Sequence, residues 1–365
     1  MNKPQTLSLA AFACLASLPA GAQTTLTVPS EVAFISNPTL TTPSRGNVAV
    51  IRTSPSLQIQ KVDGPIRTEW SLGATIERSS NTDRSANRTL PRAGFLWEST
   101  GPVSVLALRA SAEVASTRET EFAEFGRVAR DTNQRIGALG VEWTRNISEG
   151  SRWVLGATHR AVSYQGGLFT DFDETSGSAA YSTDLSPTAR LSVGTTVATV
   201  NPAGLADNSS RAGITVGYET DLSEALLFAA NAGFVRTDAA TSSTNPVGGL
   251  RLTYTGERLR YTLGWTREVS AGGTVVGFTR VQNINASVTL PLSADNDVSF
   301  GISHAKLLDG ARDAGATAFL RWSSVLSPFW TFTAGLEHRR AMPFTGPTAR
   351  GQAVILGLTY SHPDF

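Results

Sequence analysis

Charged side chains recur in this chain at alternate positions of segments that are otherwise rich in apolar residues. Arginine dominates the set and glutamate accompanies it: the residues are Arg109, Arg190, Arg211, Arg251, Arg260, Arg321 and Arg339, with Glu77, Glu113, Glu142, Glu219 and Glu337. Guanidinium groups attract anionic groups, and rings of charged side chains in a pore bias which solutes pass. If these residues line a bore, their modest excess of arginine favours a polar or anionic solute. Ion pairs that only order the wall would explain the same residues equally well.

Catalytic chemistry finds little support in the sequence. The four histidines are His159, His304, His338 and His362; none has the spacing of a metal ligand set, and the chain has no Gly-x-Ser-x-Gly motif or phosphate loop. We therefore expect no catalytic residue, no cofactor and no metal, and keep a hydrolase only as a minor alternative. The formal net charge of +1 gives no reason to expect nucleic acid as a partner.

The elements that would position the charges are β-strands, and residues 247–266 show the pattern most clearly. Leu250, Leu252 and Tyr254 alternate with small, polar or charged residues, and the alternation resumes after a break at residues 256–258. Successive side chains of a strand point to opposite faces, so this period makes one face apolar and the other polar.

The same alternation recurs from about residue 54 to the end of the chain, with no helical stretch between repeats to supply a core. Short turns, as at residues 63–65 and 326–328, alternate with longer polar loops, of which residues 116–133 form the longest. This asymmetry is typical of membrane β-barrels, which have short periplasmic turns and longer outer loops. About seventeen strands would be unusually many for a sandwich, whereas closing the sheet removes the edges that hydrocarbon cannot tolerate.

We predict an all-β, transmembrane, antiparallel up-and-down β-barrel of 16–18 strands. Bacterial barrels have even strand numbers, and we prefer eighteen, with one strand taken from residues 31–52. A barrel of this size leaves an aqueous lumen, and the abundance of Gly, Ser and Thr on the polar face fits such a lumen.

Aromatic residues on the apolar face support the membrane assignment. They are Trp70, Trp97, Trp143, Trp153, Tyr218, Tyr254, Tyr261, Trp265, Trp322 and Trp330, and several lie close to a turn. Amphipathic rings prefer the headgroup level, where barrels carry aromatic girdles. The alternative is that these rings pack in the core of a soluble fold.

The beginning of the chain predicts export. Lys3, the apolar stretch 7–18 and the small residues 20–22 resemble a secretory signal peptide that is cleaved before Gln23. We expect residues 1–22 to be this signal, residues 23–50 to be an N-terminal periplasmic segment that includes a first strand in some form, and residues 51–365 to be the barrel. The single cysteine, Cys14, lies in the signal, so the exported chain would contain no disulfide.

The sequence resembles the Gram-negative outer-membrane β-barrel proteins over about residues 50–365. Phe365 resembles the aromatic last residue that the barrel-assembly machinery recognises. Within this class, the segments 53–57, 249–254 and 260–265 look like those of barrels associated with exopolysaccharide biosynthesis clusters. The resemblance implies an outer-membrane location, a lipid surround, the assembly machinery as a partner, and periplasmic polysaccharide-export components as further partners.

Three functions remain open. The first is a passive channel that serves as the exit port for a polysaccharide; the second is a general diffusion porin; and the third is a structural or adhesive barrel that acts through outer loops such as 116–133. A loop folded into the lumen would favour the porin, an unobstructed arginine-lined bore would favour the polymer, and prominent ordered loops around a closed lumen would favour adhesion.

Overall fold

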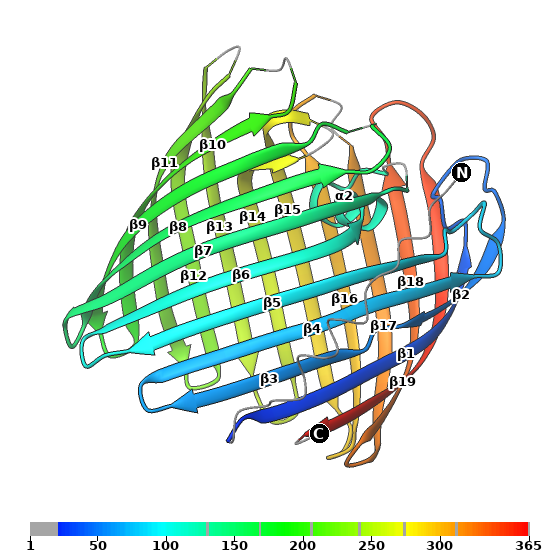
Figure 1. The fold of residues 1–365 in the computed structure, drawn as a ribbon, viewed down its shortest axis with the longest axis horizontal. Helices are drawn as coiled ribbons and strands as arrows, with labels where there is room; N and C mark the ends of the chain where they lie inside the picture. Colours follow the sequence, from blue (N-terminus) through cyan, green and yellow to red (C-terminus); the bar gives the residue numbers. More distant parts are fainter. Residues whose placement is uncertain are drawn as a thin grey trace.

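The computed structural model describes residues 21–363, apart from 129–130, 168, 205–206, 240–241, 273–274 and 311–312. Its strands form one antiparallel sheet that closes on itself, because β1 pairs with β19 (Figure 1). The elements are β1 (Gln23–Ser36), β2 (Asn47–Thr53), β3 (Ser56–Asp63), β4 (Ile66–Ser79), β5 (Arg88–Thr100), β6 (Ser104–Ser116), α2 (Thr117–Phe125), β7 (Asn133–Ser148), β8 (Ser151–Tyr164), β9 (Phe172–Ser186), β10 (Ala189–Pro202), β11 (Ser209–Ser223), β12 (Leu226–Asp238), β13 (Ser243–Thr255), β14 (Arg260–Gly272), β15 (Val275–Pro291), β16 (Asn296–Leu307), β17 (Ala314–Ser327), β18 (Trp330–Met342) and β19 (Ala349–Pro363).

The 19 strand segments occupy eighteen places in the wall, which confirms the preferred strand number. β2 and β3 share one place, because both pair with β1 on one side and β4 on the other. The break between them is at Ser54 and Pro55, and Ser54 N–H donates to the carbonyl of Pro29 across the gap at 2.9 Å. Proline cannot donate to a sheet ladder, so Pro55 accounts for the interruption.

The first strand differs from the sequence-based expectation. Residues 23–36 form a wall strand paired to β19 from Thr25 to Ser36, so the barrel begins at Gln23 rather than near residue 51. Leu26, Val28, Val32 and Phe34 alternate on its outward face, but the Thr, Ser and Pro residues around them concealed the pattern. Residues 1–20 of the predicted signal and the predicted assembly residue Phe365 lie outside the described residues.

Short and long connections lie at opposite ends of the barrel. The start of β1 and the end of β19 lie at the end with the short turns (Figure 1). Short turns and both termini mark the periplasmic end of such barrels, so the long loops are extracellular.

The outer face of the wall is an apolar belt. Large side chains on it stay exposed, among them Leu139 at 62 %, Phe234 at 60 % and Leu263 at 50 %. The predicted aromatic residues lie on this face: Trp70, Trp153, Tyr218, Trp322 and Trp330 are exposed, and Trp97, Trp143, Tyr254, Tyr261 and Trp265 are half-buried. Lipid contact is the physical explanation for so large an exposed apolar surface. None of the helices in the described part of the chain is long and apolar enough to cross a membrane.

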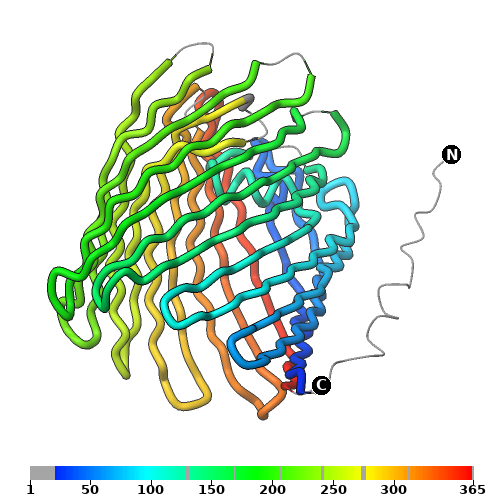
Figure 2. The backbone as a smooth tube through the Cα atoms, turned by 60° about the vertical axis from the view of Figure 1, so that its left-hand side comes forward, coloured from blue at the N-terminus to red at the C-terminus, as the bar shows by residue number. Residues whose placement is uncertain are grey.

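Buried apolar side chains gather in small clusters rather than in one core. The three clusters in the described residues are Leu40, Phe122, Ala341 and Ala349; Val162, Phe172, Val200 and Ala271; and Phe125, Val281 and Leu307. Each cluster contains a residue from a segment that turns inward from the extracellular end. Figure 2 shows the longest of these segments, which includes α2, inside the ring of strands.

Candidate solute constriction

The helix α2 crosses the bore from β6 to the opposite wall. It follows β6 directly, yet it contacts β15, β16 and β17, which are far from β6 around the barrel (Figure 1). Two phenylalanines one helical turn apart anchor it. Phe122 packs with Leu40 and Ala341, and Phe125 packs with Val281 and Leu307.

Two glycines let the end of α2 approach the wall. Gly126 ends the helix in the left-handed conformation, with φ +67°, and a Cβ there would lie 2.2 Å from Ala305 O and 2.3 Å from Gly315 N. A Cβ on Gly315 would in turn lie 2.8 Å from Gly126 Cα. Arg127 then forms an ion pair with Asp313 at 3.1 Å. Backbone thus touches backbone where α2 meets β16 and β17.

The tip of the β14–β15 hairpin also turns inward. Ala271 and Phe278, which continue the lipid-facing parity of their strands, pack here with Val162 and Phe172 on the inner wall of β8 and β9. Arg211 of β11 fastens this tip: it donates to Val269 O, pairs with Glu174 at 3.2 Å, and lies 4.9 Å over the Phe278 ring.

The two inward segments meet each other. Glu124 of α2 accepts a hydrogen bond from Ser270 of the hairpin at 2.7 Å, and Gly272 lies against the Phe125 ring. Burial raises the pKa of the Glu124 carboxyl above its ordinary value, although the Ser270 hydroxyl partly opposes this.

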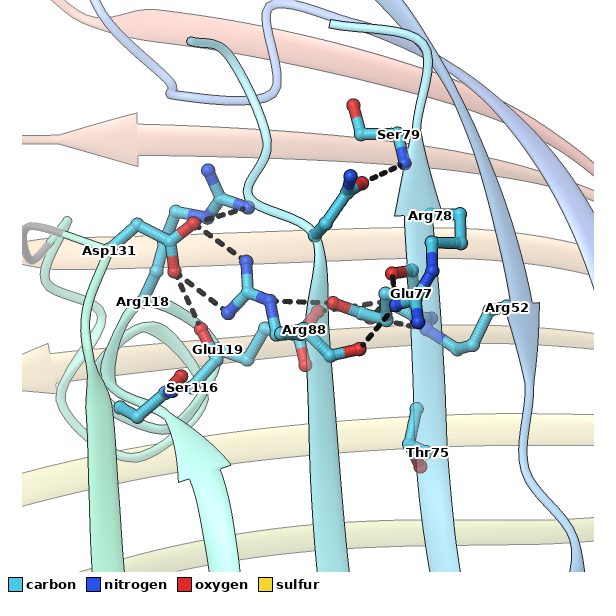
Figure 3. A network of polar contacts seen from close by, with 12 residues as sticks. Arg52, Thr75, Glu77, Arg78, Ser79, Arg88, Ser116, Arg118, Glu119 and Asp131 are labelled. Carbon is cyan, nitrogen blue, oxygen red and sulfur yellow. Dashed lines mark hydrogen bonds and ion pairs between the residues drawn. The ribbon is translucent and has the colours of Figure 1, made fainter. Parts of the chain in front are cut away.

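Beside α2, a chain of ion pairs joins the helix to β2, β4 and β5 (Figure 3). Arg52 contacts Glu77 at 2.6 Å, Glu31 at 2.9 Å and Glu119 at 3.1 Å. Glu77 and Arg88 are buried, at 4 % and 7 % exposure, and form an ion pair at 2.7 Å. The wall and the inward loop therefore share one electrostatic network.

The network continues to the end of the loop. Asp131 pairs with Arg88 at 2.7 Å and with Arg118 at 3.4 Å, and accepts a hydrogen bond from Ser116 at 2.9 Å. Burial alone would raise the pKa of Asp131, but these three donors hold it below its ordinary value. Burial lowers the pKa of Arg118, and repulsion from Arg88 and Arg339 acts in the same direction while Asp131 opposes it.

A cavity of ≈ 160 Å³ lies between α2 and the inner wall of β1, β2, β4 and β17 to β19. Its lining combines four arginines with four glutamates, namely Arg52, Arg118, Arg321, Arg339, Glu31, Glu77, Glu119 and Glu337. Most of these charges are neutralised within the wall, for Arg339 pairs with Glu337 and Arg52 with three carboxylates. Arg321 is exposed and has no carboxylate within ion-pair distance in the described part of the chain. Among the described residues that line this cavity, Arg321 is therefore the arginine that is free to bind an anionic solute.

The structure distributes the sequence-predicted charges over the whole lumen. Glu77, Arg321, Glu337 and Arg339 come together at the constriction. Arg109, 3.9 Å from Glu142, borders a second hollow of ≈ 500 Å³ on the inner wall of β4 to β9.

The remaining predicted charges lie elsewhere. Arg190 lies opposite Glu219 near the periplasmic end and pairs with Asp184 at 2.6 Å. Arg211 fastens the hairpin, and Arg251 and Arg260 lie on β13 and β14. They do not form a single ring.

Sequence reasoning missed the residues that complete the constriction. Arg118, Glu119 and Asp131 belong to the loop that was expected to be extracellular, and Glu31 and Arg52 belong to β1 and β2. The one available signal was the spacing of Phe122 and Phe125, three residues apart among charges, which is typical of a short helix with one apolar face. Within the described residues, no group of three or more His, Cys, Asp or Glu could hold a metal ion.

Several solved structures have a fold similar to that of this chain. The chain resembles the outer membrane protein OpdK of Pseudomonas aeruginosa (TM-score 0.54, 10 % identity, covering 95 % of this chain and 100 % of that one). It also resembles OccK2 (OpdF) of P. aeruginosa in complex with glucuronate (0.56, 12 %, 94 % and 98 %) and OccAB4 of Acinetobacter baumannii (0.54, 9 %, 94 % and 98 %). No protein-family model and no curated protein matches the sequence.

These similarities and the apolar outer belt lead to the same conclusion. The chain is an eighteen-stranded barrel of the Gram-negative outer membrane, surrounded by its lipid. At this level of identity the comparison establishes the fold, and the solute must be argued from the lumen itself.

Proposed function

We propose that this barrel is a passive channel for small polar solutes, with a preference for anions, and that α2 and the charged cavity beside it select them. The observation that carries the proposal is Arg321, a cation without a carboxylate partner in the described wall, at a constriction where the other charges are paired. A solute carboxylate could displace water from Arg321 and form a bidentate contact that the wall does not already satisfy. OccK2, which has the same fold, holds glucuronate in its structure.

Passage of a polysaccharide, our first expectation, receives less support. A polymer exit port should offer an unobstructed bore, whereas α2 and the β14–β15 tip both enter this lumen. For the same reason we assign no role to periplasmic polysaccharide-export components, and we keep the barrel-assembly machinery as the expected partner for insertion. We propose no catalytic role. We also do not propose adhesion, because the ordered loop that contains α2 turns into the lumen instead of projecting outside the cell.

Single-channel recording in planar bilayers under a salt gradient tests the proposal. The reversal potential should show anion preference, and Arg321→Gln should reduce that preference while the barrel stays folded. Arg135→Gln, which removes an exposed arginine on the outward parity of β7, is the matched control and should behave like the unmodified protein. Glucuronate should block the current more strongly than neutral glucose; equal block by the two sugars, or no current at all, contradicts the proposal.

A further inference from the structure

A row of cationic and imidazole side chains lies on the outer face of β16 to β19, at the extracellular border of the apolar belt. His304 is opposite Ala316, Ala316 is opposite Arg340, and Arg340 is opposite Arg350, so the row runs across four adjacent strands. Lys306 lies two residues further along β16 on the same face. We name His304, Lys306, Arg340 and Arg350 the rim cluster.

The outward direction of the rim cluster follows from its parity. Even-numbered residues of these strands are exposed where the belt begins: Ile302 at 45 %, Leu336 at 55 % and Val354 at 45 %. Arg340 and Arg350 share this parity and are themselves exposed. They therefore face the membrane side and not the lumen.

Arg340 and Arg350 form a like-charge pair that nothing in the described protein compensates. They are directly opposite on adjacent strands, an arrangement that destabilises a sheet unless a counter-charge is present. Neither has a carboxylate within ion-pair distance among the described residues. The β18–β19 loop, residues 343–348, contains no acidic residue.

The neighbouring carboxylates are already engaged. Asp309 binds Arg280 at 2.7 Å, and Asp313 binds Arg127 at 3.1 Å. Arg236, an outward cation at the same border, pairs with Asp238 at 3.2 Å, and Arg135 of β7, which has no carboxylate partner among the described residues, lies opposite Val114 and Ser163 rather than opposite a second cation. The rim cluster is thus a site of uncompensated positive charge within the described surface.

The height of the rim cluster identifies its environment. Trp330 lies at the periplasmic end of β18, and Arg340 lies ten residues further along the same strand. At ~3.3 Å per residue and a tilt of ~40°, this separation spans ~25 Å along the membrane normal, the usual height of the apolar band. Arg340 and Arg350 therefore lie at the level of the lipid headgroups of the outer leaflet.

We infer that the rim cluster binds the phosphate groups of a phosphorylated glycolipid of the outer leaflet. A phosphate between Arg340 and Arg350 accepts hydrogen bonds from both guanidinium groups and removes their mutual repulsion. Lys306 and His304 are placed to contact a second phosphate or a sugar hydroxyl of the same headgroup, while its acyl chains lie on the exposed aliphatic side chains below. The inference concerns the outer face and does not depend on the proposed channel function.

The purified barrel in detergent is titrated with bis-phosphorylated lipid A and with its dephosphorylated form, and binding is measured by native mass spectrometry. We expect the phosphorylated lipid to bind preferentially. Arg340→Gln with Arg350→Gln should weaken its binding about thirtyfold, as expected for the loss of two cations near a lipid surface. The pair Arg340→Lys and Arg350→Lys should retain most of the affinity because the charges remain.

The control is Arg251→Gln with Arg260→Gln, which removes two arginines on the lumen parity of β13 and β14. It should bind the phosphorylated lipid like the unmodified protein. Equal binding of the two lipid forms, or equal loss in the lumen control, would overturn the inference. If the glutamine pair does not fold, as judged by heat-modifiable gel migration, the lysine pair and the comparison of the two lipids on the unmodified protein decide the matter.

Discussion

The residue that joins the wall to the inward loop is Glu77. It is buried between Arg52 and Arg88, and the network passes through it to Asp131. Sequence reasoning placed Glu77 on the lumen face because its parity required that. It could not show that Arg88 lies directly opposite Glu77, which depends on the β4–β5 register, or that Asp131 lies beside Arg88, which depends on how the chain returns to the wall after α2.

Glu77→Gln should destabilise the barrel by about 3 kcal/mol. The substitution leaves two buried or half-buried guanidinium groups short of a counter-charge, which is costlier than losing an exposed pair. Urea unfolding followed by tryptophan fluorescence measures the change. Glu142→Gln is the control: it breaks the exposed 3.9 Å pair with Arg109 and should cost less than about 1 kcal/mol. Equal effects of the two substitutions would show that burial of the network adds nothing.

The Glu124 carboxyl predicts a pH dependence of the constriction. Its pKa in the folded protein is raised above the unfolded value by burial, with Arg160 opposing and Glu268 and Glu174 reinforcing the shift. Burial of Glu124 where α2 meets the hairpin is therefore favoured while the carboxyl is protonated, although the Ser270 hydrogen bond favours the ionised form, and the stability that the protonated form contributes is lost as pH rises through the raised pKa. We expect current fluctuations to increase as the pH rises from below to above the raised pKa of Glu124.

Glu124→Gln keeps a hydrogen-bonding side chain at this contact and removes the ionisation. Its current fluctuations should be as low at neutral pH as those of the unmodified protein in acid. Single-channel traces recorded at several pH values decide this, and a glutamine variant with the full pH dependence would exclude Glu124 as the titrating group.

At the scale of elements, the strands were predictable and the inward segments were not. Alternation fixed the faces of the wall because lipid and water act on every second residue of each strand. The β14–β15 tip keeps that alternation while its apolar side chains contact the opposite inner wall, so period alone cannot reveal that it bends. The helix α2 was hidden for a different reason, since its anchoring residues, such as Val281 and Leu307, lie far away in the sequence.

Gly126→Ala should displace α2 and raise the mean single-channel conductance. The added methyl group would meet backbone atoms of Ala305 and Gly315, which cannot move without disturbing the wall. Gly310→Ala is the matched control, because Gly310 has φ +61° but nothing within 4 Å of its added Cβ. Both substitutions put alanine at a positive φ and so carry the same backbone strain. The two variants therefore differ only in whether the added methyl group prevents the close contact between α2 and the wall. Equal conductance in the two variants would contradict the role of this contact.

At the scale of the whole molecule, the wall of the barrel and its constriction are held by different contacts. The wall is held by a continuous ladder from β1 round to β19, whereas α2 adds only local contacts to its inner face. The strand number followed from the count of alternating segments and the need for closure. The position of the first strand did not, because Thr, Ser and Pro residues lie between the alternating apolar residues Leu26, Val28, Val32 and Phe34 of the stretch 23–36.

Replacing residues 118–131 with a short Gly-Ser linker should give a folded barrel with severalfold higher conductance. The wall ladder is untouched, while the helix and two acidic members of the network, Glu119 and Asp131, are removed. Heat-modifiable migration reports folding, and bilayer recording reports conductance. An unfolded product would show that the loop is needed to build the wall.

The docking of α2 has a consequence for biogenesis. The helix leaves the ribosome early, at residues 117–125, but the surfaces that receive Phe122 and Phe125 include residues 281 to 349. A nascent or half-inserted chain lacks those surfaces, so the helix cannot dock until the last strands have joined the barrel. Maturation should therefore pass through an intermediate in which the sheet is closed but the lumen is unobstructed. Docking of the helix, which narrows the lumen, is then the last folding step.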